Sequence, residues 1–312
     1  MIRSGWSDPV IESNSFLKAI SKIMSRKVNE NPENFPDIRS SEYLLIFSDY
    51  SGEGKKDSHF SISVLVMGSD DWKEWESGRQ IWRRRYLSDG RRMSHKNLSD
   101  IQKSLALTPF FELLDQTSGF LITIGIQKNF DYIVNEIPID LDNRFFSEYR
   151  IWSPKVLQKM VIVSNLISLF VSGFGAKGQN LIWISDQDSM FANETRLGGA
   201  TKLFSSILAG YLSFDLGHIR VGTTKSDPGD QQLEDLVAVA DLAAGTFCER
   251  LNSAEKSPLS GDFLPLFAPD LTARSAKINQ WLCGSGSNLR KYFFKVDRTG
   301  PQNSTTSLFA LE

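Results

Sequence analysis

Compact apolar runs and helically spaced apolar positions succeed each other along this chain in an order that predicts a mixed α/β protein. Apolar runs at 43–47 and 59–67 are separated by a turn containing Gly and Lys, and a third run occupies 120–126. Each has the length and the polar boundaries of a β-strand. The sequence therefore predicts three successive strands, with a helical, basic insertion over 70–119 between the second and the third.

The second half of the chain alternates helices and strands. Apolar positions spaced by three and four predict helices over 154–170, 196–212 and 231–251, and apolar runs predict strands at 181–185 and 218–224. Three consecutive strands followed by this alternation indicate an antiparallel meander joined to right-handed crossovers. The result is a mixed sheet flanked by helices, in an order that resembles the ribonuclease-H-like fold.

The chain is expected to divide into three parts. Residues 1–42 form an N-terminal appendage with a short amphipathic helix, and 43–251 form the ribonuclease-H-like domain with its insertion. Residues 252–312 form a C-terminal extension, in which a Pro-rich connection leads to a short helix near Trp281 and a strand at 291–296. We expect the two terminal extensions to offer a binding surface to a protein partner.

Composition and charge narrow the class of protein. The chain has 312 residues, 35 Lys and Arg against 37 Asp and Glu, and 41% hydrophobic residues, which excludes disorder, collagen and coiled coil. Cys248 and Cys283 form no CxxC pair, so neither a thiolate metal site nor a disulfide framework is indicated. The N-terminus lacks the pattern of a signal peptide. The apolar stretch 156–171 is shorter than the ~20 residues needed to cross a bilayer. We expect a cytoplasmic protein with no membrane partner.

Two predicted strands end alike, LLIFSD at Asp49 and LIWISD at Asp186. If these strands are parallel neighbours, both carboxylates emerge at the carboxyl edge of the sheet, where open α/β sheets bind ligands. Close carboxylates repel unless a proton or a cation lies between them, and such oxygen ligands suit Mg²⁺ or Mn²⁺. Either aspartate alone is better explained as the start of a turn, whereas the pair favours a metal site. Asp188, farther into the loop, is an alternative to Asp186.

A third carboxylate lies inside the last predicted helix, in LEDLVAVADLAAG. Asp241 is bordered by apolar residues, and an unpaired charge there is costly to bury, so it should have a partner. The partner is either a metal ion or an arginine. Glu234, seven residues earlier, lies on nearly the same helix face. We expect Glu234 to contact the metal ligands and not the metal itself.

These motifs resemble a known family. DYSGEG after the first strand, the aspartate that ends the fourth and VAVADLAAG on the last helix are similar to the domain-of-unknown-function 3800 family, whose members share the ribonuclease-H-like fold. The usual patterns of that family, D-E-S-G and L-Q-x-A-D-x-x-A-G, are matched at Asp49, Ser51, Gly52, Ala240, Asp241, Ala244 and Gly245. Two positions depart from it: Tyr50 replaces the usual acid and Ala238 the usual glutamine.

The resemblance implies a metal-dependent nuclease that hydrolyses phosphodiester bonds of DNA or RNA. In such nucleases acids on the first strand, the fourth strand and the last helix hold two divalent cations, Mg²⁺ or Mn²⁺, about 4 Å apart. Asp49 would bridge the two metals, with Asp186 and Asp241 as further ligands. Family association also suggests a place in a bacterial defence system.

Two more acids are candidate metal ligands. Glu53 lies close enough to compensate for the acid missing at Tyr50. Glu148, near the start of the first crossover helix, is either a fourth ligand or an ordinary acid beside the helix dipole. Because Tyr50 and Ala238 depart from the family pattern, the alternative is a catalytically inactive nucleic-acid-binding or scaffold subunit.

The insertion carries a strong local charge. Residues 79–96 contain seven Lys or Arg and one Asp, a balance of +6 in a chain of net charge −2. Trp82 and Tyr86 lie among the arginines, a combination typical of single-strand binding. The predicted nucleic-acid contacts are Arg83, Arg84, Arg85, Arg91, Arg92, Lys96 and, at the end of the fifth strand, Lys225. The alternative is a solvated helix face paired with the acids just upstream, Asp70, Asp71, Glu74 and Glu76.

Overall fold

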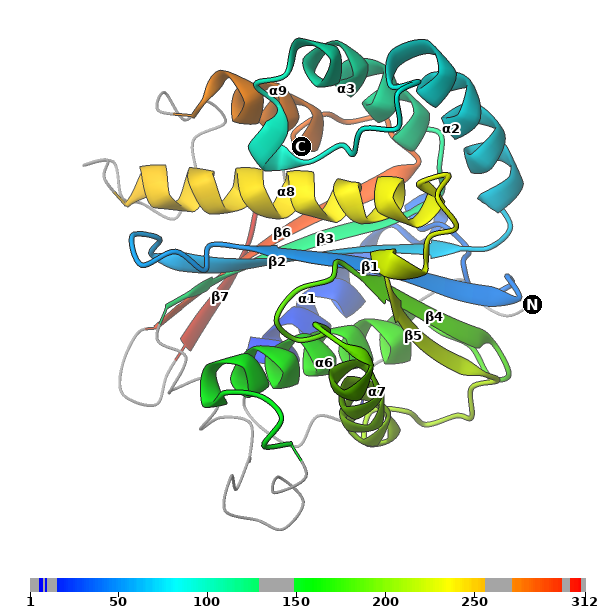
Figure 1. The fold of residues 1–312 in the computed structure, drawn as a ribbon. Coiled ribbons are helices and arrows are strands. Elements are labelled where there is room, and N and C mark those ends of the chain that lie inside the picture. The colour runs from blue at the N-terminus through cyan, green and yellow to red at the C-terminus, as the bar shows by residue number, and fades with distance from the viewer. Residues whose placement is uncertain are drawn as a thin grey trace.

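The structure is a computed structural model and describes residues 6–7, 9, 16–128, 149–255, 271–298 and 304–309. Seven strands in these residues form one mixed sheet in the order β5-β4-β1-β2-β3-β6-β7 (Figure 1). Strands β2 and β7 run opposite to the other five. The strands are β1 Tyr43–Ser51, β2 His59–Gly68, β3 Gly119–Gln127, β4 Asn180–Ser185, β5 Ile219–Thr223, β6 Leu289–Arg298 and β7 Ser304–Phe309.

Helices cover both faces of the sheet (Figure 1). One face carries α8, with α2, α3 and α9 on the same side; these helices are α2 Trp72–Tyr86, α3 Ile101–Leu114, α8 Gln232–Ala254 and α9 Ala273–Leu282. The other face carries α1 Phe16–Glu30, α6 Pro154–Phe174 and α7 Glu194–Ala209. Short 3-10 turns lie at η1 Pro32–Asn34, η2 His95–Asn97 and η3 Thr224–Ser226. The protein is therefore a mixed sheet between two helical layers, as the sequence predicts.

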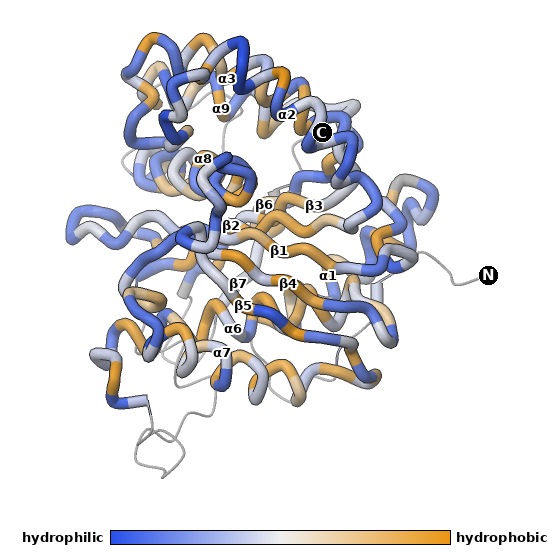
Figure 2. The backbone as a smooth tube through the Cα atoms, turned by 45° about the vertical axis from the view of Figure 1, so that its right-hand side comes forward, coloured by the Kyte–Doolittle hydropathy of each residue, from blue (hydrophilic) through white to orange (hydrophobic). Residues whose placement is uncertain are grey.

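Successive side chains of a strand face alternate helical layers. Leu44 and Ile46 of β1 join the core under α6, whereas Leu45 and Phe47 join the core under α8. Figure 2 shows the hydrophobic residues running along the central strands, while the outer helices alternate between hydrophobic and hydrophilic positions. Since successive side chains of a strand point to opposite faces, Asp49 continues the series that faces α8.

The predicted order of elements is confirmed, from β1, β2 and β3 through α6, β4, α7 and β5 to α8. The boundaries move by a few residues: β1 continues to Ser51, and α7 begins at Glu194. Asp227 accounts for the start of α8, because its carboxylate accepts hydrogen bonds from the backbone N–H groups of Gln231, Leu233 and Glu234. These are donors that the first turn of a helix leaves without partners.

The terminal segments belong to the same core as the middle of the chain. Helix α1 packs on α6 and β7 and buries one apolar face: Phe16, Leu17, Ile20 and Met24. The predicted helix near Trp281 and the predicted strand after it are confirmed as α9 and β6. Strand β6 pairs with β3 in parallel, and β7 pairs with β6. One sheet thus crosses the predicted boundary at residue 251, and α1 is a docked helix, where the sequence predicted an appendage.

Helix α6 is the predicted buried helix. Among the helices described here it alone is long and apolar enough to cross a membrane, and 89% of its apolar window is buried inside the protein. A core helix meets the same criteria of length and composition, so α6 is weak evidence for a membrane span.

Candidate functional site

Three aspartates that are far apart in the sequence line one pocket at the carboxyl edge of the sheet. Strands β1 and β4 are parallel neighbours with Ser48 opposite Ser185, so Asp49 and Asp186 directly follow this last pair. Asp241 comes from α8, which packs across β1 and β2. All three line a pocket of about 450 Å³. The structure therefore brings together the three aspartates that the sequence singled out.

The loop over 52–58 brings the chain back from β1 to β2, and Glu53 in this loop lines the pocket. Gly52 has φ +87°, a conformation that favours glycine. A Cβ on Gly52 would lie 2.2 Å from the carbonyl oxygen of His59. Gly52, the first glycine of the DYSGEG motif, is therefore required by the backbone that follows Asp49.

Burial and neighbouring carboxylates destabilise the charged forms of Asp49 and Asp241. Burial raises the pKa of Asp49 well above its usual range, and the nearby charges of Asp241 and Asp186 raise it further. Burial also raises the pKa of Asp241 to about 6, with a contribution from Asp186 and against a hydrogen bond from the His95 backbone N–H. Like charges held close in a partly buried pocket favour binding of a proton or a cation.

The aspartates lack the basic partners that their neighbours have. Within the described ranges, none of the three forms an ion pair with Lys or Arg, whereas the acids around them do: Asp235 with Arg79 and Arg83, Glu234 with Arg92, and Asp188 with Lys159. The pocket thus contains three carboxylates whose charge no contacting cation balances.

The side chains of the three aspartates are not arranged as the ligands of a bound metal ion. Within the part of the chain that the structure describes, no group of three or more His, Cys, Asp or Glu side chains is arranged to hold a metal ion. One oxygen of each aspartate accepts a hydrogen bond: Asp49 from Tyr50 N–H (2.7 Å), Asp186 from the Thr224 hydroxyl (3.0 Å) and Asp241 from His95 N–H (2.6 Å). Each carboxylate retains a second oxygen. The donor set therefore suits a hard cation, which would have to draw the three side chains inward.

Tyr50 faces the opposite side of the sheet from Asp49. Its hydroxyl lies 2.8 Å from Ser48 Oγ and 3.2 Å from Ser185 Oγ, and burial raises its pKa far above the usual range. A neutral phenol in this position is a structural group. Ala238, the other departure from the family pattern, lies on the pocket wall.

Lys159 on α6 is a pocket residue that the sequence did not single out. Its Nζ lies 2.5 Å from Glu53 Oε1 and 2.6 Å from Asp188 Oδ2. Glu53, a predicted metal ligand, and Asp188, the alternative to Asp186, are therefore both partners of a lysine. The first crossover helix places a cation in the pocket where the resemblance implies a carboxylate. Glu148, the predicted fourth ligand, lies outside the described residues.

His95 has a structural role. Its ring Nε2 lies 2.9 Å from Ser275 Oγ, and burial lowers the pKa of the imidazole to about 4. The ring packs on Gly245, where an added Cβ would lie 2.6 Å from Nδ1. Through its backbone N–H the same residue holds Asp241. A lone histidine in a basic loop carries no sequence signal for this role.

The basic residues of the insertion that lie on α2 differ in burial, because they point to different faces of the helix. Arg83 is buried, with its guanidinium 2.5 and 2.7 Å from the two carboxylate oxygens of Asp235. The prediction that Arg83 contacts nucleic acid is therefore wrong, because its charge is already matched inside the protein. Trp82 is 4% exposed and donates its indole N–H to the Ala106 carbonyl, so it offers no face to a base. Arg84 and Arg85 are exposed.

The remaining predicted contacts lie near or on the pocket rim. Arg92 and Lys96 line the aspartate pocket, and Arg92 pairs with Glu234 at 2.8 Å. Arg91 pairs with two aspartates of its own loop region, Asp89 and Asp100. Lys225 is exposed on η3, next to the threonine that hydrogen-bonds Asp186. Basic side chains therefore lie around the pocket that contains the three aspartates.

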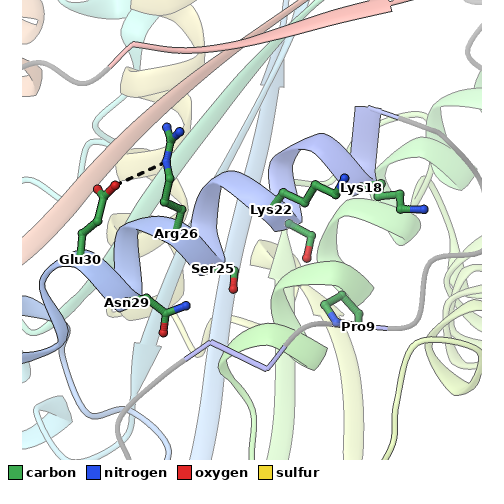
Figure 3. A pocket seen from close by; sticks show the side chains of 8 residues that line it. Pro9, Lys18, Lys22, Ser25, Arg26, Asn29 and Glu30 are labelled. Carbon is green, nitrogen blue, oxygen red and sulfur yellow. Dashed lines mark ion pairs between the residues drawn. The ribbon is translucent and has the colours of Figure 1, made fainter.

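A larger hollow of about 600 Å³ lies on the outer face of α1 (Figure 3). It is lined by Pro9, Lys18, Ser21, Lys22, Ser25, Arg26, Asn29 and Glu30. Its single carboxylate, Glu30, pairs with Arg26 at 3.6 Å. Since this lining is basic and its one carboxylate is already paired, whereas the sheet edge gathers three carboxylates, we place the candidate site at the sheet edge.

Comparison with known proteins adds little. No family model matches the chain, and no curated protein matches it. A solved structure that it is similar to is the ribonuclease H2 from Pyrococcus horikoshii OT3, at 14% identity and a TM-score of 0.29, over 76% of this chain and 97% of that chain. A TM-score this low carries no argument about activity. The resemblance to the domain-of-unknown-function 3800 family stays a prediction.

Proposed function

We propose that this chain is a Mg²⁺- or Mn²⁺-dependent nuclease that hydrolyses phosphodiester bonds of DNA or RNA, with Asp49, Asp186 and Asp241 as ligands of the cation. The observation that carries the proposal is the group of three carboxylates in one pocket, unpaired with any described Lys or Arg, beside neighbours that are all paired. A protein gains no stability from such a group, because each charge opposes the others. A bound cation would remove that cost.

The sheet supports the same proposal. The five strands from β5 to β3 lie in the order β5-β4-β1-β2-β3, and only β2 runs against the rest. The ribonuclease-H-like prediction requires this meander joined to parallel crossovers. It also requires acids at the ends of the first and fourth strands and on the last helix. In support, Asp49 and Asp186 follow the last residue pair that β1 and β4 share, and Asp241 lies on α8.

The pocket residues would have different roles in the proposed reaction. The cation would activate a water molecule and stabilise the leaving oxygen. Asp49 lies within reach of the charges of both other aspartates, while the Thr224 hydroxyl and the His95 N–H hold Asp186 and Asp241 in place. Lys96 and Arg92 at the rim are placed to contact the phosphate backbone.

Metal binding and cleavage test the proposal together. Purified wild type, Asp49→Ala and Asp241→Ala are titrated with Mn²⁺ by calorimetry and incubated with labelled single- and double-stranded DNA and RNA, with Mn²⁺, Mg²⁺ or chelator. Asp70→Ala, which removes an exposed acid, is the matched control. We expect wild type and control to bind Mn²⁺ and to cleave, and both site variants to lose the two properties.

Two outcomes would overturn the proposal. Cleavage that survives both chelator and Asp49→Ala would exclude the mechanism. A wild type that binds a polynucleotide but neither binds Mn²⁺ nor cleaves would favour the inactive nucleic-acid-binding or scaffold subunit.

A further inference from the structure

A lysine lies inside the acidic pocket and is held there from several sides. Lys159 is 7% exposed. Its Nζ contacts Glu53 and Asp188 at 2.5 and 2.6 Å and lies 4.5 Å from the centre of the Tyr50 ring. Lys159, both acids and Tyr50 all line the pocket that contains the three aspartates. The ammonium group is therefore part of the same site.

Contacts with two carboxylates and one aromatic ring hold this ammonium group in place. A buried charge needs partners, and two carboxylates and an aromatic face supply them. The aromatic face is available because Tyr50 replaces the family's usual acid. A carboxylate at that position would offer no ring to the lysine.

The pocket thus contains two sets of acids, which differ in whether they have a basic partner. Asp49, Asp186 and Asp241 have no contacting base among the described residues. Glu53 and Asp188 already share one positive charge. Two-metal sites need acids around two cation positions about 4 Å apart. Here the second set already has a cationic partner, the Lys159 ammonium group, which is covalently part of the chain.

We propose that the Lys159 ammonium group takes the place of the second divalent cation, so that the chain binds one metal ion at the three aspartates. This inference rests on the proposed function and replaces the two divalent cations that the family resemblance implies with one. An ammonium group has three donors. Glu53 and Asp188 take two of them, and the third has no hydrogen-bond acceptor among the described residues. We assign that donor to a non-bridging oxygen of the substrate phosphate.

The number of Mn²⁺ ions bound per chain tests the inference without an activity assay. Calorimetry and the electron paramagnetic resonance signal of free Mn²⁺ count the ions in the full-length protein. We expect wild type to bind one. Glu53→Gln, which removes one lysine partner, should also bind one with nearly unchanged affinity. A supporting residue of a metal site would cost about tenfold or more when replaced.

Variants of the lysine complete the test. Lys159→Ala frees two carboxylates and should raise the number of Mn²⁺ ions from one to two, whereas Lys159→Arg keeps a cation in place and should leave it at one. Far-UV circular dichroism checks that each variant is folded. If Lys159→Ala does not fold, wild type and Glu53→Gln decide the question.

The results separate the two proposals. Two Mn²⁺ ions on wild type, a tenfold or greater loss of affinity in Glu53→Gln, or a folded Lys159→Ala that still binds one ion would overturn the role of Lys159 and leave the nuclease proposal intact. A wild type that binds no Mn²⁺ would overturn the nuclease proposal and the inference with it.

Discussion

Replacing Asp241 with Asn should stabilise the protein when no divalent cation is bound. The pKa of Asp241 is raised from 3.8 to about 6, a difference of about 2, and each pKa unit corresponds to 1.36 kcal/mol. The ionised carboxylate therefore lowers the free energy of unfolding by up to about 3 kcal/mol. Asn keeps an acceptor for the His95 N–H. For a chain of this size we expect a rise in Tm of about 2–6 °C.

The effect should depend on pH in a definite direction. The folded pKa of Asp241 lies above the unfolded one, so the folded protein binds more protons between about pH 4 and pH 6. Stability therefore falls as the pH rises through this window, and the cost is complete above it. Below about pH 4 the carboxyl group is protonated in both states. Asp241→Asn should accordingly gain stability near neutral pH and lose that gain at about pH 4.

Thermal unfolding with chelator at the two pH values measures the effect. Asp235→Asn, on the same helix, is the matched control, because Asp235 is buried and paired with Arg79 and Arg83. Removing one member of a buried ion pair costs about 3–5 kcal/mol, so this variant should unfold at a lower temperature. Saturating Mn²⁺ should reverse the order of wild type and Asp241→Asn, since only wild type gains the free energy of binding.

Either of two results would refute this argument. Asp241→Asn could prove less stable than wild type in chelator near neutral pH. Its gain could also be equal at neutral pH and at about pH 4. The first result would mean that the hydrogen bond to Asp241 outweighs the cost of burying its charge. The second would mean that the gain does not come from that charge.

Three further predictions follow from the contacts of the site and of α2. Arg83→Ala should lower the free energy of unfolding by about 3–5 kcal/mol, because it leaves the buried carboxylate of Asp235 with fewer partners. Arg84→Ala changes an exposed side chain and should alter the free energy of unfolding by no more than about 0.5 kcal/mol. Similar urea midpoints for the two variants would contradict this. Mn²⁺ affinity measured by calorimetry should fall as the pH drops below about 6, where protons compete for Asp241, and a constant affinity down to pH 5 would exclude that competition. Gly245→Ala should weaken Mn²⁺ binding about tenfold, because its Cβ displaces the loop that hydrogen-bonds Asp241; Gly198→Ala, whose Cβ meets nothing within 4 Å, is the control and should bind as wild type does.

Local sequence patterns were sufficient for the elements and for the centre of the site. The spacing of apolar residues reflects helix and strand periodicity directly, which is why the order of β1 to α8 could be predicted. The alike endings of two strands were informative for a similar reason: parallel neighbours end at one edge, so Asp49 and Asp186 had to meet once β1 and β4 paired. Asp241 was recognisable as a charge in an apolar stretch.

The partners of the charged residues were decided only by tertiary packing. Arg83 and Arg84 are neighbours in one basic run, yet one is buried against Asp235 and the other is exposed, because successive residues of a helix point in different directions. Asp235 is 152 positions from Arg83, and Glu53 is 106 positions from Lys159. Short-range periodicity determines which face a residue takes on its own element. The partner that lies opposite that face depends on how distant elements pack, and no local pattern contains it.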